Sequence, residues 1–334
     1  MMRVTIFAVA CVVGLATGSP VLRKLESGPR FQYEKDATGE NHLVDTWVTL
    51  DNMAESARYT PELQNIYHLF TRENPTVSQP LLINNVATLQ SSNYKSSRRT
   101  IVLLHGWRDS IVSDFNTVIV PSFLEAEDVN VLCVDWSAGA GSINYNTALA
   151  NTLTSGVAVA DFLNWLISAS GSVPVQFHIV GHGLGAHQAG IVGRNVRGDV
   201  AYITALDAAL IGWINLNDRF QADDAMYTEA IHTNAGVNGY VSDYAHVDFY
   251  VNGGESMPGC NSHACDHARA IFYFAESITS GGFRGKLCVN YLAAMLESCN
   301  ILPGRLNMGG LKSKVGSRGV YLVETNPSPP FSRS

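Results

Sequence analysis

The sequence has few charged residues, no excess of basic residues and, after its first 15 residues, no long hydrophobic run. Only 15% of the 334 residues are Asp, Glu, Lys or Arg, and 46% are hydrophobic, which excludes an intrinsically disordered chain. The formal net charge of −7 argues against nucleic acid as a partner. No later run reaches the ~20 apolar residues that cross a bilayer. The sequence therefore predicts a globular protein without a transmembrane segment.

Motifs for cofactors and metals are also missing. Neither G-x-G-x-x-G nor a G-K-[ST] ending, which bind nucleotides, is present. The Cys and His residues between 260 and 267 lack the repeated pair spacing of a zinc site. We therefore expect no cofactor and no metal ion.

The chain begins with a pattern typical of a secretory signal. Arg3 supplies a charged start, residues 4–15 are apolar, and Ala16-Thr-Gly18 provides small residues for cleavage. We expect residues 1–18 to be a signal peptide. Residues 19–334 are expected to form a single domain of an extracellular, secreted protein.

The most informative segment lies between Ile179 and Gly190 and reads I-V-G-H-G-L-G-A-H-Q-A-G. A hydrolase nucleophile elbow has the sequence G-x-S-x-G on a sharp turn between a buried strand and a helix. Gly181 and Gly185 match the outer glycines, and Gly183 stands where the nucleophile belongs. We expect a strand over 175–180 and a helix over 184–196. The alternatives are a chance glycine-rich turn between a strand and a helix, and a nucleotide-binding loop.

Two later segments supply an acid and a base in the order that α/β hydrolases use. A strand expected over 200–206 ends at Asp207, and His267 follows downstream in Cys265-Asp-His267. Strands also alternate with helices, for example the strand expected over 99–104 and the helix expected over 146–168. This alternation predicts an α/β-hydrolase fold, with a mostly parallel central sheet and helices on both faces.

Taken together, these segments resemble the animal neutral lipase family, the pancreatic and lipoprotein lipase group with its insect relatives. The resemblance covers roughly residues 60–325. Two strand-like segments, 47–50 and 66–70, also follow the family's early sheet. The matching stretches are Leu104–Trp107, Asn130–Trp136, Gly181–His187, Ala205–Asp207, Ile231–Thr233, His246–Gly254, Pro258–Cys260 and Cys265–His267.

The resemblance implies roles for individual residues. Asp207 would be the acid and His267 the base of a catalytic triad, with Gly183 at the vacant nucleophile position. The backbone N–H groups of Trp107 and Leu184 would form the oxyanion hole.

The family also implies a cysteine pattern. Four cysteines allow three pairings, and family position favours Cys260–Cys265 and Cys288–Cys299. Cys133 lies in an apolar run and is expected to be a small buried hydrophobe. In the family the first pair brackets a lid, but only residues 261–264 lie between these cysteines. The segment Leu210–Leu216 either lines an acyl groove or packs as ordinary surface.

Two further expectations concern the end of the chain and its partners. The sequence stops soon after Pro330, so we expect no C-terminal β-sandwich domain of the vertebrate lipase type and no colipase-type partner. A lipid or acyl-chain ligand is implied by the resemblance. The sequence defines neither that ligand nor the oligomeric state.

The missing serine decides the functional hypotheses, because insect yolk proteins and related inactive lipases share this loss. The leading hypothesis is a secreted lipase-fold pseudoenzyme that binds a lipid or lipid conjugate, or serves as a yolk or nutrient store. The rival is a weak carboxylic ester hydrolase, a lipase or phospholipase A1 in lipid catabolism, that uses water or an unrecognised nucleophile. Ser137, Ser256 and Ser262 are expected in loops without elbow geometry.

Overall fold

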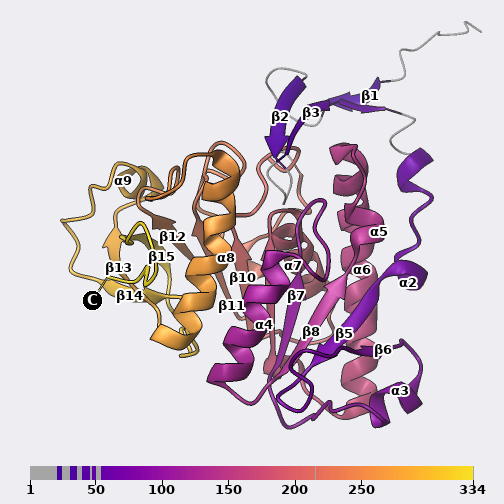
Figure 1. Cartoon of the computed structure of the whole chain (residues 1–334). Helices are drawn as coiled ribbons and strands as arrows, with labels where there is room; N and C mark the ends of the chain where they lie inside the picture. The colour runs from indigo at the N-terminus through magenta and orange to yellow at the C-terminus, as the bar shows by residue number, and fades with distance from the viewer. Residues whose placement is uncertain are drawn as a thin grey trace, which may run out of the picture.

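The computed structural model describes residues 21–24, 31–35, 40–45, 47–49, 54–214 and 216–333, and the expected signal peptide lies outside them. Within these residues the centre is an 11-stranded sheet (Figure 1). Its strands, in spatial order, are β14 (Arg305–Met308), β13 (Phe283–Cys288), β15 (Gly319–Val323), β12 (Val247–Val251), β11 (Tyr227–His232), β10 (Tyr202–Leu206), β9 (Phe177–His182), β7 (Thr100–Leu104), β8 (Asn130–Asp135), β5 (Ile66–Phe70) and β6 (Gln79–Leu81).

The middle of the sheet is parallel and both edges are antiparallel. The strands from β8 through β7, β9, β10, β11 and β12 to β15 pair parallel, whereas β5, β6, β13 and β14 pair antiparallel. Every residue of β7 and β9 is buried, as expected for parallel strands covered on both faces. The direction of winding reverses between β7 and β9, which is where open α/β sheets bind ligands at the carboxyl ends of their strands.

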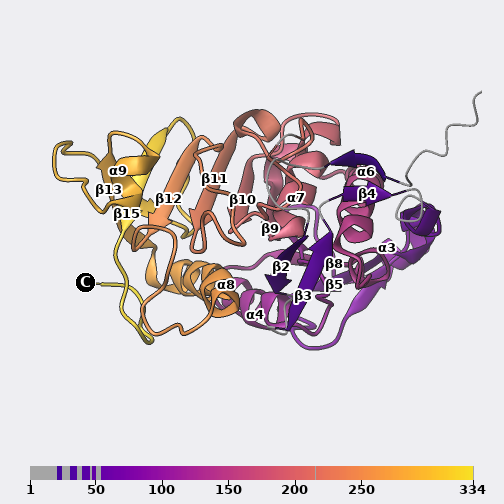
Figure 2. The same ribbon diagram turned by 90° about the horizontal axis from the view of Figure 1, so that it is seen from above.

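Helices cover both faces of this sheet. Viewed from above, α4 (Asp114–Ala126) and α8 (His263–Ser280) lie on one face, and α6 (Tyr145–Ser170) and α7 (Leu184–Asn195) on the other (Figure 2). Each helix pair packs on the strands through a cluster of buried residues. The predicted α/β-hydrolase fold, mostly parallel with helices on both faces, is therefore confirmed.

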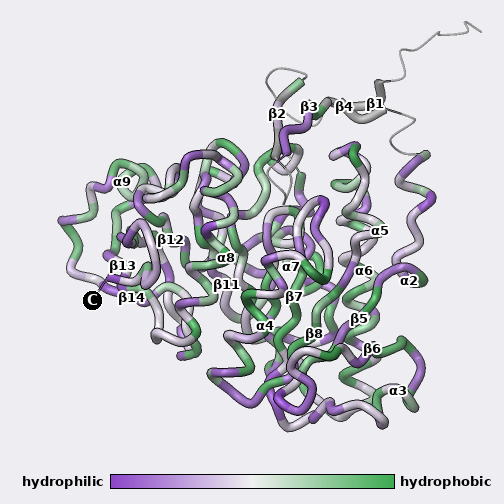
Figure 3. Tube along the Cα trace, in the orientation of Figure 1, coloured by the Kyte–Doolittle hydropathy of each residue, from purple (hydrophilic) through white to green (hydrophobic). Residues whose placement is uncertain are grey.

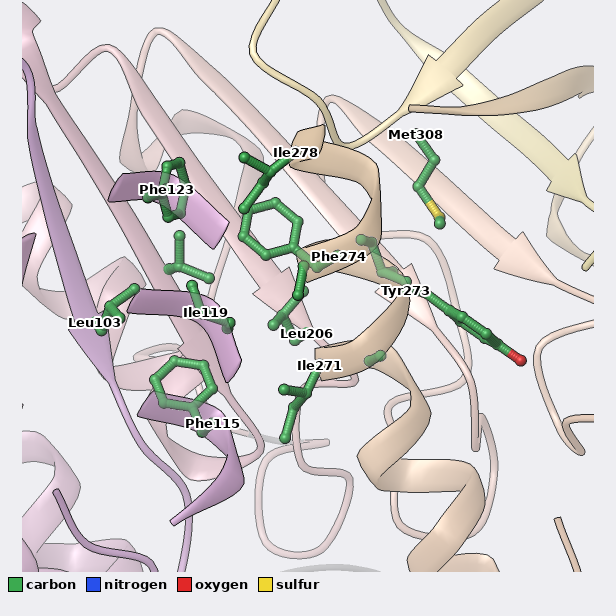
Figure 4. Packing of buried hydrophobic residues seen from close by; sticks show 14 of the residues in the cluster. Leu103, Phe115, Ile119, Phe123, Leu206, Ile271, Tyr273, Phe274, Ile278 and Met308 are labelled. Atoms are coloured by element: carbon green, nitrogen blue, oxygen red, sulfur yellow. The ribbon is translucent and has the colours of Figure 1, made fainter. Parts of the chain in front are cut away.

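On one face of the sheet, α4 and α8 pack against each other and against the strands. Phe115, Ile119 and Phe123 of α4 point toward Ile271, Phe274 and Ile278 of α8, above Leu103 and Leu206 of the sheet (Figure 4). Figure 3 shows hydrophobic segments gathered around β7 and β8, two parallel neighbours in the sheet. Burial of each such side chain stabilises the fold by roughly 1.5–3 kcal/mol.

The shorter elements and the cysteines complete the main body. The short helices are α2 (Pro61–Gln64), α3 (Val86–Gln90), α5 (Ser137–Ala140) and α9 (Tyr291–Met295), with 3₁₀ turns η1 (Pro174–Gln176) and η2 (Ala222–Asp224). Cys260 is bonded to Cys265 and Cys288 to Cys299, in the pairing that the family resemblance implied. Cys133 is free and buried in β8. None of the described helices is long and apolar enough to cross a membrane.

The strands that precede the main body form two small sheets of their own. β1 (Val21–Lys24) pairs with β4 (Trp47–Thr49), and β2 (Phe31–Lys35) pairs with β3 (Asn41–Asp45). The expected strand at 66–70 does join the central sheet as β5. The prediction that residues 47–50 also join it is wrong, because this strand, β4, pairs with β1 instead. A local pattern identifies a strand but not its partner.

Candidate active site

The turn between β9 and α7 has the backbone of a nucleophile elbow, with glycine at its centre. Gly183 is the N-cap of α7 and has φ +56° and ψ −117°, a conformation that is strained for any residue with a side chain. A Cβ added at Gly181 would lie 2.0 Å from the carbonyl oxygen of Gly185. A Cβ added at Gly185 would lie 2.1 Å from the carbonyl oxygen of Leu104. The two outer glycines are thus required by close backbone contact, whatever the chemistry at the centre.

The position of Gly183 is different, because it faces a single side chain. Among the described residues, the atoms within 4 Å of a Cβ added there are His267 Nε2 at 3.2 Å and Cε1 at 3.7 Å. A serine hydroxyl at this position would therefore point toward the imidazole nitrogen that a general base uses. A contact of 3.2 Å is tight, so the ring would have to move by a few tenths of an ångström to admit a side chain.

Asp207 holds the opposite edge of the same imidazole. Its Oδ2 lies 2.6 Å from His267 Nδ1, and its Oδ1 accepts hydrogen bonds from the backbone N–H groups of Thr233 (2.8 Å) and Asn234 (2.9 Å). Asp207 is fully buried, and a Cβ at Gly239 would come within 2.4 Å of Oδ1. With Nδ1 donating to the carboxylate, Nε2 presents a lone pair toward Gly183.

His182 of the elbow also contacts His267. Its ring lies 4.3 Å from that of His267, centroid to centroid, and its Nε2 donates to the His267 carbonyl oxygen over 3.2 Å. Burial, and then the nearby His267, lower the pKa of His182 well below its usual value. A neutral His182 therefore fixes the backbone of His267 without adding a positive charge beside it.

The two residues assigned to an oxyanion hole come from different parts of the fold. Leu184 is the first residue of α7, so its N–H has no acceptor inside the helix, and the helix N-terminus favours negative charge there. Trp107 follows β7, with its indole Nε1 donating to the Ser142 carbonyl over 2.8 Å. The next residue, Arg108, has φ +53° and donates its N–H to the Ala140 carbonyl over 3.0 Å. Within the described chain no backbone acceptor is recorded for the N–H of Trp107 or Leu184.

The β2–β3 hairpin covers Trp107 from outside. The His42 ring lies 5.1 Å from the Trp107 ring in an edge-on arrangement, and Val44 is buried in the hydrophobic cluster that contains Trp107. A cavity of about 420 Å³ lies beside this contact; it is lined by Leu43, Val44, Glu55, Ser142, Ile143, Asn144 and Tyr145. No motif in the sequence pointed to this hairpin.

Other candidate segments are less open than expected. In the segment proposed to line an acyl groove, Ile211 and Trp213 are buried, and Trp213 stacks on His187 at 4.0 Å, which favours the packing alternative. Of the serines placed in loops, Ser137 instead begins α5 and Ser262 caps α8. No cluster of metal-binding side chains is found in the part of the chain that the structure describes.

This fold, with an elbow and an aspartate–histidine pair at the carboxyl edge of a parallel sheet, defines an α/β hydrolase. Residues 36–319 match the lipase family, and the chain belongs to that family. It is similar to pancreatic triacylglycerol lipase of Oryctolagus cuniculus (30% identity over 84% of this chain and 66% of that protein). It is also similar to pancreatic lipase-related protein 2 of Bos taurus (34%) and inactive pancreatic lipase-related protein 1 of Homo sapiens (32%), each over 79% of this chain and 64% of the relative.

The chain thus spans about two thirds of the length of the curated relatives it matches. The relatives include proteins named as lipases and one named as inactive. Membership of the family therefore supports a carboxylic ester hydrolase scaffold. Whether this chain is active depends on its own site residues.

Proposed function

We propose that this protein is a lipase-family pseudoenzyme that binds a lipid or lipid conjugate, or serves as a nutrient or yolk store, and that it cannot form an acyl-enzyme at its elbow. The observation that carries this proposal is Gly183. The elbow backbone is kept, but the position facing His267 Nε2 has no side chain and so no oxygen that could attack a carbonyl.

We further propose that the protein is secreted, with residues 1–18 as signal peptide and the rest as one domain. The apolar leader supports this localisation, and so do the two disulfides, which persist in oxidising compartments. Binding without turnover is compatible with this chain, because loss of a nucleophile does not by itself remove the contacts that hold an acyl group.

A second candidate function is slow ester hydrolysis by water. It is supported by the 2.6 Å contact between Asp207 and His267, which would let the imidazole remove a proton from a water molecule in the space beside Gly183. Trp107 and Leu184 would supply N–H donors to the developing oxyanion. Such a lipase or phospholipase A1 activity would be weak, because water lacks the fixed position of a side-chain nucleophile.

The test compares Gly183→Ser with Gly183→Ala on short-chain esters and on phospholipid vesicles. Both variants place a Cβ at the same strained position, so only the serine oxygen differs between them. We expect Gly183→Ser to hydrolyse esters at least ~100-fold faster than Gly183→Ala, since loss of the serine in subtilisin costs about 2 × 10⁶ in kcat. The gain should disappear when His267→Ala is added.

Three results separate the alternatives. Slow turnover by the unmodified protein that requires His267 would support the water mechanism over the binding role. Turnover equal to that of an active relative and unaffected by His267→Ala would contradict both the site and the pseudoenzyme proposal. A folded but inactive Gly183→Ser protein would show that the site lacks more of the catalytic geometry than the nucleophile alone.

A further inference from the structure

The loop that joins β13 to β14, residues 289–304, exposes several apolar side chains to solvent. They are Val289, Leu292, Leu296 and Ile301. The disulfide between Cys288 and Cys299 closes this loop and fixes it on the body of the protein. Several exposed apolar side chains on one fixed loop indicate a surface that another phase or molecule covers.

The helix within this loop presents two of the four side chains outward. α9 packs on the sheet through Ala294, which is fully buried in a cluster that includes Val320 and Leu322 of β15. Successive residues of an α-helix are rotated by about 100°, so Leu292 and Leu296 each lie about 160° from Ala294. Both leucines therefore point away from the sheet.

Basic side chains lie on the same face of the sheet, beside α9. Side chains alternate along a strand, so Arg284 and Lys286 of β13 share the face of Cys288, which is the face that α9 covers. Arg305 of β14 is paired directly opposite Lys286 and so lies on this face too. The exposed loop and the basic side chains thus project from one side of the sheet edge.

This basic group contains too few carboxylates to neutralise it. With Glu324 and Arg333, the three basic residues of β13 and β14 line a pocket of about 290 Å³. Glu324 lies 2.9 Å from Lys286 Nζ and 3.9 Å from Arg333 Nη1. Within the described residues, no carboxylate pairs with Arg284 or Arg305. Lys286 and Arg305 are like charges directly opposite each other, an arrangement that destabilises a sheet. A bound anion would remove this repulsion, although the chain as a whole carries a net charge of −7.

We propose that this face binds an anionic phospholipid surface, with the apolar side chains of the loop among the acyl chains and the basic side chains on the lipid phosphates. Such a surface offers both partners at once, negative headgroups and an apolar phase beneath them. A soluble polyanion would pair with the cations and leave the apolar side chains in water. The loop itself contains one acidic residue, Glu297, and no basic one, so the attraction to headgroups comes from the strands.

This surface is separate from the crevice at Gly183. β14 is an edge strand of the sheet, and β13, β15, β12, β11 and β10 lie between it and β9. Figure 1 shows α9, β13 and β14 together at one end of the molecule. The proposal therefore goes beyond the function proposed for the crevice and does not depend on it.

The experiment measures co-sedimentation of the purified full chain with phosphatidylcholine vesicles, with and without ~30% phosphatidylserine. We expect binding to be at least about tenfold tighter with phosphatidylserine, and to weaken as added salt screens the charges. Arg284→Gln combined with Arg305→Gln should weaken that binding about tenfold or more. The matched control combines Arg58→Gln with Arg197→Gln, at exposed arginines outside this face, and should leave binding unchanged.

A second pair of variants tests insertion of the loop. Leu292→Asn combined with Leu296→Asn, at leucines 53% and 78% exposed, should also weaken binding about tenfold or more. Its control combines Leu82→Asn with Leu63→Asn, at leucines 53% and 83% exposed, and should have no effect. All these side chains are exposed, so the melting temperatures should match that of the unmodified protein.

Several results would overturn the proposal. Absence of vesicle binding, equal binding with and without phosphatidylserine, or an equal loss in variants and controls would each do so. Binding to a soluble sulfated polysaccharide that needs the arginines but not the leucines, without vesicle binding, would assign the cations to a polyanion instead. None of these results would alter the outcome of the Gly183→Ser test.

Discussion

At the scale of single residues, the glycines of the elbow have separate reasons for being glycine. Gly181 and Gly185 are fixed by backbone contacts of 2.0 and 2.1 Å, whereas Gly183 is fixed by its backbone conformation alone. The spacing of these glycines could be predicted from the sequence, because the motif is local. The support that Gly239 and Asn234 give to Asp207 could not, since those residues are distant in the chain and meet it only after folding.

This difference gives a prediction for alanine substitutions in the elbow. Gly181→Ala should destabilise the fold by more than ~4 kcal/mol, because its Cβ would overlap backbone atoms that cannot move independently. Gly183→Ala should cost only ~1–3 kcal/mol of backbone strain. Urea unfolding of the two variants, followed by circular dichroism, measures both values. Equal losses would mean that the turn relaxes around Gly181.

At the scale of elements, a buried lysine attaches the loop that precedes β15 to the sheet. Lys314 is paired with Glu229 of β11, and its ammonium also donates to the carbonyl oxygens of Asn307 (3.2 Å) and Gly309 (2.9 Å). Both charged side chains are almost fully buried. This pairing could not be predicted from the sequence, because the acidic partner of Lys314 lies 85 positions away.

Removing one member of this pair should be far worse than removing both. We expect Lys314→Met to lower the free energy of unfolding by about 3–5 kcal/mol, since it leaves the buried Glu229 carboxylate without a counter-charge, with the Tyr227 hydroxyl still donating to it. The double variant Lys314→Met with Glu229→Gln should recover more than half of that loss. A double-mutant cycle in urea provides the measurement, and an additive result would show that the pair is not coupled.

The N-terminal strands could be predicted from the sequence only in part. Phe31-Gln-Tyr-Glu-Lys35 alternates aromatic and polar residues, the pattern of a half-buried strand, and it forms β2. That signal was available from the sequence. Its partner β3 and its position over Trp107 were not, because register and docking depend on contacts between segments.

At the scale of the whole molecule, several buried histidines make stability depend on pH. Burial lowers the pKa of His187 to about 3 and the pKa values of His178 and His182 well below the usual range. His187 accepts a hydrogen bond from the Phe220 N–H at Nδ1, over 3.1 Å, and its Nε2 lies 2.7 Å from the Ala209 carbonyl. Only the neutral ring fits both partners.

The sign of the effect follows from these directions. A histidine with a lowered pKa in the folded state contributes stability above pH ~6.5, and that contribution is lost as the pH falls toward the folded value. We therefore expect the free energy of unfolding to fall between pH 7 and pH 5, by about 2 kcal/mol at pH 5 for His187. His187→Gln should flatten this slope by that amount, measured by urea unfolding across the range.

The matched control is His263→Gln, at a histidine whose side chain is 52% exposed. This variant controls for replacing an imidazole with an amide at a solvent-exposed position. A slope that His187→Gln leaves unchanged would mean that His187 takes up a proton without unfolding.

The β2–β3 hairpin contacts the turn that carries Trp107, although the two segments are distant in sequence. His42 and Val44 lie on its inner side against Trp107, whereas Phe31, Tyr33 and Leu43 are exposed on the other side. The turn that carries Trp107 thus has a neighbour encoded more than 60 positions before it. Two relatives with identical elbow sequences could bind different ligands if only their first 45 residues differed.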